Sequence, residues 1–410
     1  MEGGSPGWRR NLYTLWVTQF IALAGMSLVL PFIPLFLQEE LGIPELGRAQ
    51  LWSGIVFSSS FFAAAFMAPV WGTLGDRYGR KPMVVRAVFG VGLAVTLMAF
   101  SQNVYQLLVF RLLQGGLGGF MAAGITLVAA SAPRERTGYA LAVLQTATTA
   151  GGLIGPLVGG VLADALGYRP IFLITGAACF VSGVAVAALV REARGERERQ
   201  TAHPGLRQGL AEVFRSPQLR GMMVILALIN FGLMVVSPIL TYYVKSFEQT
   251  FFGLGPSFTV GLMFATPGLA ALLATPFWGK AADRYGPRPT LVVSLFATSL
   301  AFAPQAAVSS VWQLFLVRWG MGLAAAGIMP SVYCSISERT SDERIGGAFG
   351  LSFSAGMIGG LIGPLTGGVL AARFGMRSVF LVTAVVLCLA AGVLNRARGE
   401  ERGEGTSRAQ

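Results

Sequence analysis

Residues 72–82 read GTLGDRYGRKP and lie directly between two long apolar runs of the chain. Charged side chains at this density do not fit a helix that faces lipid, because an ionised group is costly inside a bilayer. The stretch therefore predicts a short polar hairpin between two membrane-spanning helices. A second version, GKAADRYGPRP, occupies 279–289, with Asp283 lying 207 positions after Asp76. The chain contains an internal repeat, and this hairpin marks its period.

The composition is that of a membrane protein. The 410 residues are 54% hydrophobic and 12% charged, whereas soluble domains carry about 25% charged residues. Apolar runs long enough to cross a bilayer, at about 20 residues each, predict twelve spans. They lie near 12–37, 51–72, 83–101, 104–129, 139–163, 170–190, 219–244, 257–278, 290–308, 311–336, 346–371 and 377–395.

The formal net charge of +12 reflects membrane topology. If both termini are cytoplasmic, 24 of the 31 Lys and Arg residues belong to inside segments, five to outside loops and two to the spans themselves. This asymmetry is the one that the positive-inside rule requires. A nucleic-acid partner is not expected, because the sequence has no zinc pattern, no basic helix and no soluble domain to carry one.

Cysteine and histidine give no indication of a metal or catalytic site. The three cysteines lie singly in apolar runs, and the only histidine, His203, stands in a charged segment. No pair has the spacing of metal ligands or of a redox motif. We therefore expect no metal and no cofactor.

The repeat extends well beyond the hairpin. Pro31 recurs as Pro238 at the same offset of 207. Arg111 likewise recurs as Arg318. After one inserted residue the offset is 208, and the glycines and proline of span five recur in span eleven: Gly151, Gly155, Pro156, Gly159 and Gly160 match Gly359, Gly363, Pro364, Gly367 and Gly368.

This regularity indicates a duplicated unit of six helices. Because six is even, both copies enter the membrane in the same orientation. We expect an N-terminal bundle at 1–190, a charged cytoplasmic linker at 191–218, a C-terminal bundle at 219–395 and a cytoplasmic tail at 396–410. A charged linker of this kind lets the two bundles move as separate bodies.

The hairpin is similar to the signature Gly-x-Leu-x-Asp-Arg-x-Gly-Arg-Lys of the major facilitator superfamily. The chain resembles twelve-span transporters of that superfamily from about Leu12 to Asn395, and within it the drug:proton antiporter group. The resemblance implies an all-α membrane protein with twelve transmembrane helices in two pseudo-symmetric six-helix bundles. The signature is matched at Gly72, Leu74, Asp76, Arg77, Gly79, Arg80 and Lys81.

The resemblance implies that Asp76 and Arg80 belong to a cytoplasmic latch between the bundles. Two positions depart from the family pattern: Pro287 replaces an arginine of the second copy, and Ser131 stands near the usual place of an acidic partner, for which Glu135 is the alternative. The basic residues also suit simple anchoring at anionic headgroups. The conformational set predicted from the two hairpins is Asp76, Arg77, Arg80, Asp283 and Arg284.

Span five carries small residues at every fourth position, which lets helix backbones approach closely. The Gly155-Pro156 step within it predicts a kink, and it resembles a motif that antiporters of the superfamily carry in this span. We therefore add both residues to the conformational set. The small face consists of Ala147, Gly151, Gly155, Gly159 and Ala163, and span eleven repeats it with Ala355, Gly359, Gly363, Gly367 and Ala371.

Arg111 lies seven residues into span four. An arginine at that depth costs about 3 kcal/mol on insertion scales, so we expect it to face the protein interior or water. The resemblance implies a part in proton coupling. A structural or snorkelling arginine is the alternative, both for Arg111 and for Arg318.

No acidic residue lies deep in a span, although a buried acid is the usual proton carrier in antiporters. Coupling would then fall to a peripheral acid, namely Asp76, Asp164, Glu39 or Glu40, or would work differently. If the resemblance holds, spans one, four, seven and ten line a central cavity. The candidates for substrate contact are Gln19, Met26, Gln114, Asn230, Met234, Tyr242, Arg318, Trp319 and Met329.

The resemblance implies a secondary transporter of the bacterial inner membrane that exports small lipophilic molecules, with the proton gradient as its energy source, and we expect it to be monomeric. The alternatives are a facilitator or exporter of one metabolite, such as a sugar or amino-acid derivative, and a receptor or scaffold that transports nothing. An enzyme is not expected, because the spans hold no catalytic set.

Overall fold

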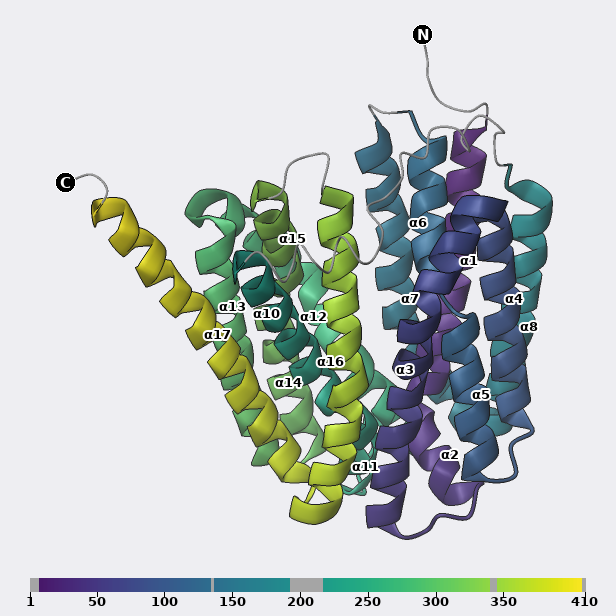
Figure 1. The fold of residues 1–410 in the computed structure, drawn as a ribbon. Coiled ribbons are helices and arrows are strands. Elements are labelled where there is room, and N and C mark those ends of the chain that lie inside the picture. The colour runs from purple at the N-terminus through teal and green to yellow at the C-terminus, as the bar shows by residue number, and fades with distance from the viewer. Residues whose placement is uncertain (1–6, 134–135, 192–216, 340–344, 408–410) are drawn as a thin grey trace. The chain divides into compact units, whose positions relative to one another are not determined.

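The computed structural model describes residues 7–133, 136–191, 217–339 and 345–407, and most of these residues are helical and none forms a strand (Figure 1). They include twelve helical segments that are long and apolar enough to cross a membrane. The predicted all-α class with twelve spans is confirmed. The helices are α1 (Trp8–Val29), α2 (Ile33–Glu39), α3 (Leu46–Tyr78), α4 (Arg80–Ala99), α5 (Val104–Leu117), α6 (Phe120–Ser131), α7 (Thr137–Leu166), α8 (Tyr168–Leu189), α10 (Pro217–Val235), α11 (Ser237–Lys245), α12 (Pro256–Tyr285), α13 (Pro287–Phe302), α14 (Val311–Ala325), α15 (Ile328–Arg339), α16 (Ile345–Phe374) and α17 (Met376–Ser407).

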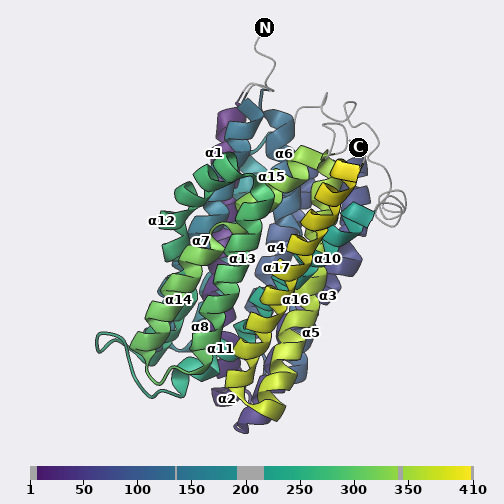
Figure 2. The same ribbon diagram turned by 90° about the vertical axis from the view of Figure 1, so that its left-hand side faces the viewer.

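The chain divides into two compact units. The first contains the described parts of 1–203 together with 250–265, and the second contains the described parts of 204–249 and 266–410. Helix α12 therefore begins in the first unit and ends in the second. Within each unit the long helices run side by side (Figures 1 and 2). Most of the predicted linker, 192–216, lies outside the described residues.

Proline interrupts the first span of each repeat. A 3-10 turn at Leu30–Phe32 contains Pro31 and separates α1 from α2. In the second copy α10 ends at Val235 and α11 begins at Ser237, with Pro238 in its first turn. A proline at this position is tolerated because the first N–H groups of a helix have no partner within that helix. The two copies thus break at equivalent points.

The polar hairpin is much shorter than the sequence indicates. Helix α3 continues to Tyr78 and α4 starts at Arg80, so Gly79 alone separates them. Its backbone has φ 100° and ψ 164°, a conformation that is open only to glycine. The prediction of a polar loop over 72–82 was wrong in extent, because charged side chains prevent burial in lipid but not helix formation beyond it.

The two copies also share polar side-chain contacts. The indole nitrogen of Trp71 donates to the Gly116 carbonyl at 2.6 Å. In the second copy Trp278 donates to the Leu323 carbonyl at 2.7 Å. Donor and acceptor both shift by 207 positions. The repeat therefore reproduces individual tertiary contacts as well as the order of helices.

The small face of α7 packs against the backbone of α1. A Cβ atom on Gly155 would lie 2.5 Å from the Ala24 carbonyl oxygen, a distance that real side chains do not tolerate. In the second copy a Cβ on Gly359 would lie 2.5 Å from the Ala227 carbonyl oxygen. The close packing expected from the four-residue spacing is confirmed in both units. Helix α7 continues through Pro156 without interruption.

Candidate functional site

Arg111 is buried between α5 and α3, with 4% of its surface exposed. Its Nη1 donates to Oε1 of Gln114 at 2.6 Å, and its Nε donates to the Val56 carbonyl at 3.3 Å. The guanidinium also lies 5.9 Å from the centre of the Phe57 ring. A charged group in this position is stabilised by neutral acceptors and an aromatic face.

The second repeat holds its arginine differently. Arg318 is 6% exposed, and its Nη1 lies 3.4 Å from Oε1 of Gln305. Gln305 in turn donates to the Met321 sulfur at 3.5 Å. Met321 occupies the position that matches Gln114 at the offset of 207. The glutamine near the arginine therefore comes from a different segment of the chain in each copy. Each buried arginine thus lies near the amide oxygen of a glutamine, which is Gln114 for Arg111 and Gln305 for Arg318.

Gln19 joins α1 to α7. It is 3% exposed, and its Nε2 donates to the Thr148 hydroxyl at 2.6 Å. Three residues earlier, the Trp16 indole donates to the Thr146 hydroxyl at 2.9 Å. Together these bonds fix the register of the two helices, in addition to the backbone contact made by the glycine face.

The other candidates for substrate contact are dispersed. Met26, Met234 and Trp319 are half-buried, and Met329 is 37% exposed, whereas Tyr242 is 3% exposed. Asn230 donates to the Leu226 carbonyl of its own helix at 3.1 Å. None of them lines the cavity between α3 and α5 or the cavity at the start of α17.

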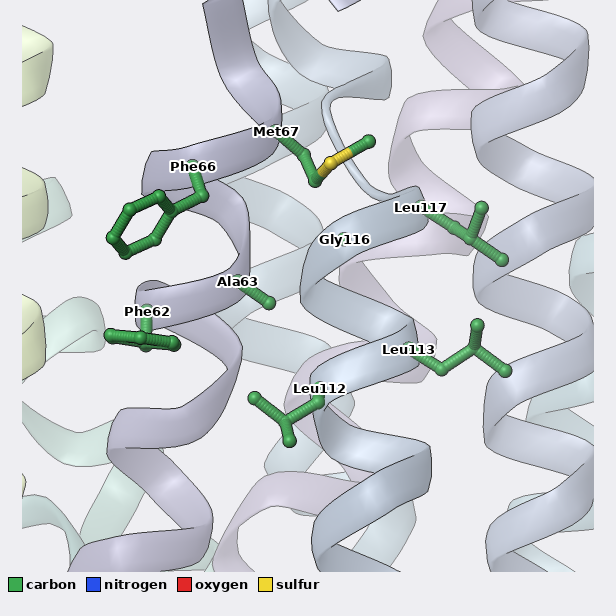
Figure 3. A pocket seen from close by; sticks show the side chains of 8 residues that line it. All are labelled: Phe62, Ala63, Phe66, Met67, Leu112, Leu113, Gly116 and Leu117. Carbon is green, nitrogen blue, oxygen red and sulfur yellow. The ribbon is translucent and has the colours of Figure 1, made fainter. Parts of the chain in front are cut away.

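An apolar cavity of about 350 Å³ lies between α3 and α5 (Figure 3). The two phenylalanines of its α3 wall, Phe62 and Phe66, have ring centres 4.8 Å apart. The sequence alone does not indicate this cavity, because apolar residues in a membrane helix suit lipid contact equally well. The lining residues are Phe62, Ala63, Phe66, Met67, Leu112, Leu113, Gly116 and Leu117.

A more polar cavity of about 430 Å³ lies at the start of α17 in the second unit. Its basic residue is Arg377, which matches Arg169 at the offset of 208. Arg169 pairs with Glu40 at 3.0 Å, but the position that matches Glu40 is occupied by Phe247. The lining residues are Tyr243, Ser246, Phe247, Ser309, Phe374, Gly375, Met376 and Arg377.

The hairpin residues have separate environments. Arg80 donates to the Thr126 carbonyl of α6 at 2.7 Å. Arg77 is exposed and lies against the ring of its neighbour, 5.4 Å from the ring centre, as Arg284 does at 5.3 Å. Asp283 is exposed. The Asp76 side chain and Glu135 lie outside the described residues, and the latch stays a prediction.

The structure assigns Arg86 a role that the sequence does not indicate. This residue lies in the second turn of α4. Its guanidinium stacks on the Trp71 ring at 3.5 Å from the ring centre, and its Nη2 donates to the Gly118 carbonyl at 3.0 Å. Arg86 therefore links α4 to α3 and to the break between α5 and α6.

Helix α7 has a second close contact, with the start of α12. A Cβ on Gly160 would lie 2.7 Å from the Ser257 carbonyl oxygen, and one on Gly261 would overlap the Pro156 carbonyl. One turn beyond Gly160, Asp164 accepts hydrogen bonds from two backbone N–H groups of α12. All of these residues belong to the first unit. The sequence indicated Asp164 as a peripheral acid but not this partner.

Comparisons with known proteins agree with the fold and the repeat. A family model described as Major Facilitator Superfamily matches residues 15–260 and 254–409. Multidrug resistance protein MdtG of Proteus mirabilis is 36% identical over 384 residues, which cover 93% of this chain and 94% of the relative. The protein of the same name from Dickeya zeae is 38% identical over 390 residues, 95% of each chain.

Solved structures show the same fold at low identity. A bacterial homologue of the human lysosomal transporter Spinster superimposes with a TM-score of 0.77 at 15% identity, covering 96% of this chain and 97% of its own. The nucleoside transporter NupG gives a TM-score of 0.73 at 15% identity, covering 94% and 98%.

Proposed function

Because the chain belongs to the major facilitator superfamily, we propose that it is a secondary active transporter that exports lipophilic small molecules across the bacterial inner membrane. The observation that carries this proposal is the similarity to relatives named multidrug resistance protein, which extends over more than nine-tenths of both chains. Export proceeds by alternating access of a midplane site. We assign transport to the chain and no catalytic step.

The buried polar groups fit substrates without a fixed charge pattern. Arg111 and Gln19 each use amide, hydroxyl or carbonyl partners, whereas the ion pair of Arg169 with Glu40 lies at the end of a span. A site without a deep acid, with methionine and aromatic side chains available, accommodates apolar molecules of varied shape.

The energy source in this proposal is the proton gradient, and no cofactor is needed. With both termini cytoplasmic, the basic residues of the two hairpins lie on the cytoplasmic side. A proton that enters from outside is exchanged for a substrate molecule that leaves. The structure offers peripheral acids for this step, of which Asp164 makes the most specific contacts.

The test is transport of a fluorescent lipophilic dye into inverted membrane vesicles, with and without an imposed pH gradient. The proposal predicts accumulation that depends on the gradient and stops when an ionophore collapses it. Vesicles that lack the protein are the control. Dye movement equal to that of the control would overturn export, and accumulation indifferent to the gradient would overturn proton exchange.

A further inference from the structure

The start of α12 lacks the groups that normally complete a helix end. The residue before the helix is Gly255, which has no side chain to accept a bond, and the first helical residue is Pro256, which has no N–H. The next two backbone N–H groups, of Ser257 and Phe258, have no partner within the helix. Such a helix end requires an acceptor from elsewhere.

Asp164 supplies that acceptor from the last turn of α7. Its Oδ1 accepts from the Ser257 N–H at 2.9 Å, and its Oδ2 accepts from the Phe258 N–H at 2.8 Å. Both oxygens of one carboxylate therefore complete the helix end, where the helix dipole also favours a negative charge. A Cβ on Gly255 would overlap this carboxylate. Glycine at 255 is what allows Asp164 to reach the helix.

The titratable neighbours of this carboxylate come from α8 and α2. The titratable groups that face the contact are Tyr168 of α8, whose hydroxyl lies against Ser257, and Glu39 of α2. The neighbouring Glu40 is neutralised by Arg169. Asp164 itself is exposed, so outside protons reach it directly. The residue that matches it in the second copy is Ala372, so the second copy has no acid at this position.

We propose that Asp164 is the proton-responsive group of the transport cycle: its carboxylate holds the first turn of α12 against α7, and its protonation releases α12. A carboxylate has acceptors for both N–H groups, whereas a carboxylic acid has lost the charge and carries a proton that needs an acceptor of its own. Because α12 continues from the first unit into the second, its release changes the link between the units. This inference rests on the proposed exchange of protons for substrate.

The direct test is hydrogen exchange of the peptide that contains Ser257 and Phe258, in the purified full-length protein in lipid nanodiscs. After correction for the intrinsic effect of pH, the wild type should lose protection as the pH falls. Asp164→Asn should remove the pH dependence and lower protection about tenfold, the ratio expected when about 1.4 kcal/mol of charge-assisted hydrogen bonding is lost. Asp164→Glu should retain part of the dependence.

Gly255→Ala is the second variant, because it keeps the acid but displaces it. It should reproduce the exchange behaviour of Asp164→Asn. The matched controls are Gly47→Ala, where a Cβ meets nothing within 4 Å, and Glu40→Gln, which removes another acid at the same side of the membrane. Both controls should retain the pH dependence of α12 exchange.

Transport measurements separate this inference from the function itself. In proteoliposomes the wild type should export dye at a rate that depends on outside pH, while Asp164→Asn should exchange dye across the membrane without that dependence. Full outside-pH dependence in Asp164→Asn, or α12 protection indifferent to pH in the wild type, would overturn the role of Asp164 alone. An inactive wild type would overturn the proposed export instead.

Discussion

Arg111 donates a 2.6 Å hydrogen bond from Nη1 to Oε1 of Gln114, one turn further along α5. In the second copy the matching residue is Met321, and Gln305 lies near the arginine instead. The residue that matches Gln305 in the first copy is Met98. Glutamine and methionine have thus exchanged places between the repeats, while each buried guanidinium has kept one amide.

This exchange predicts a compensated pair of substitutions. Gln114→Met should lower the free energy of unfolding by about 2 kcal/mol, because it leaves a buried charged donor without its acceptor. Adding Met98→Gln should restore at least half of the loss by recreating the arrangement of the second copy. The midpoint of thermal unfolding in detergent measures both. An unchanged midpoint in Gln114→Met would show that the bond contributes nothing.

The effect of replacing a glycine of α7 should depend strongly on which face of the helix that glycine occupies. Gly155→Ala should destabilise the first unit by about 1–3 kcal/mol and reduce transport, because the added methyl group overlaps the α1 backbone. Gly152→Ala, on the exposed face of the same helix with nothing within 4 Å, is the matched control and should behave as wild type. Equal stability of the two variants, measured by thermal unfolding, would contradict the close packing.

Gly79 should tolerate no other residue. Gly79→Ala places a side chain at φ 100°, at an expected cost of about 1–3 kcal/mol. Gly72→Ala lies in the helical part of the same motif with open space around it, and it should be neutral or slightly stabilising. Measured expression and thermal stability should therefore differ between two glycines only seven positions apart.

Asp76→Asn should slow dye export about fivefold or more, within the range typical of couplings between conformational states, while membrane insertion is unaffected. The reason is that an acid is not needed for topology, so its recurrence as Asp283 indicates a specific contact. Asp283→Asn in the second copy gives the comparison. Export at the wild-type rate by Asp76→Asn, at equal protein levels, would leave the motif with an anchoring role only.

The repeat made much of the fold predictable from the sequence. The period of 207 anticipates that Trp278 repeats the contact of Trp71, and the spacing of four anticipates the close approach at Gly155. Both are regularities along the chain. The extent of the helices was less predictable, because Arg80 and its neighbours remain helical once the helix has left the apolar layer.

Partners across the fold could not be predicted in the same way. Asp164 accepts hydrogen bonds from backbone N–H groups 93 and 94 positions away. Because every residue except proline has a backbone N–H group, the sequence does not show which of them is the donor. The only indication was a glycine before α12 and a proline at its first position, which predict an uncapped helix start but not its acceptor. The contact of Arg86 with the Trp71 ring could not be predicted for a similar reason, since the sequence does not show that these two side chains meet.

A junction of one residue has a mechanical consequence. Gly79 is the single residue between α3 and α4. Close to this junction, Arg86 of α4 stacks on Trp71 of α3 and holds the two helices together. The two helices are therefore held in a fixed relation to each other at the end where Gly79 joins them. A displacement of the charged residues at that end would therefore move α3 and α4 together, because no loop separates the two helices.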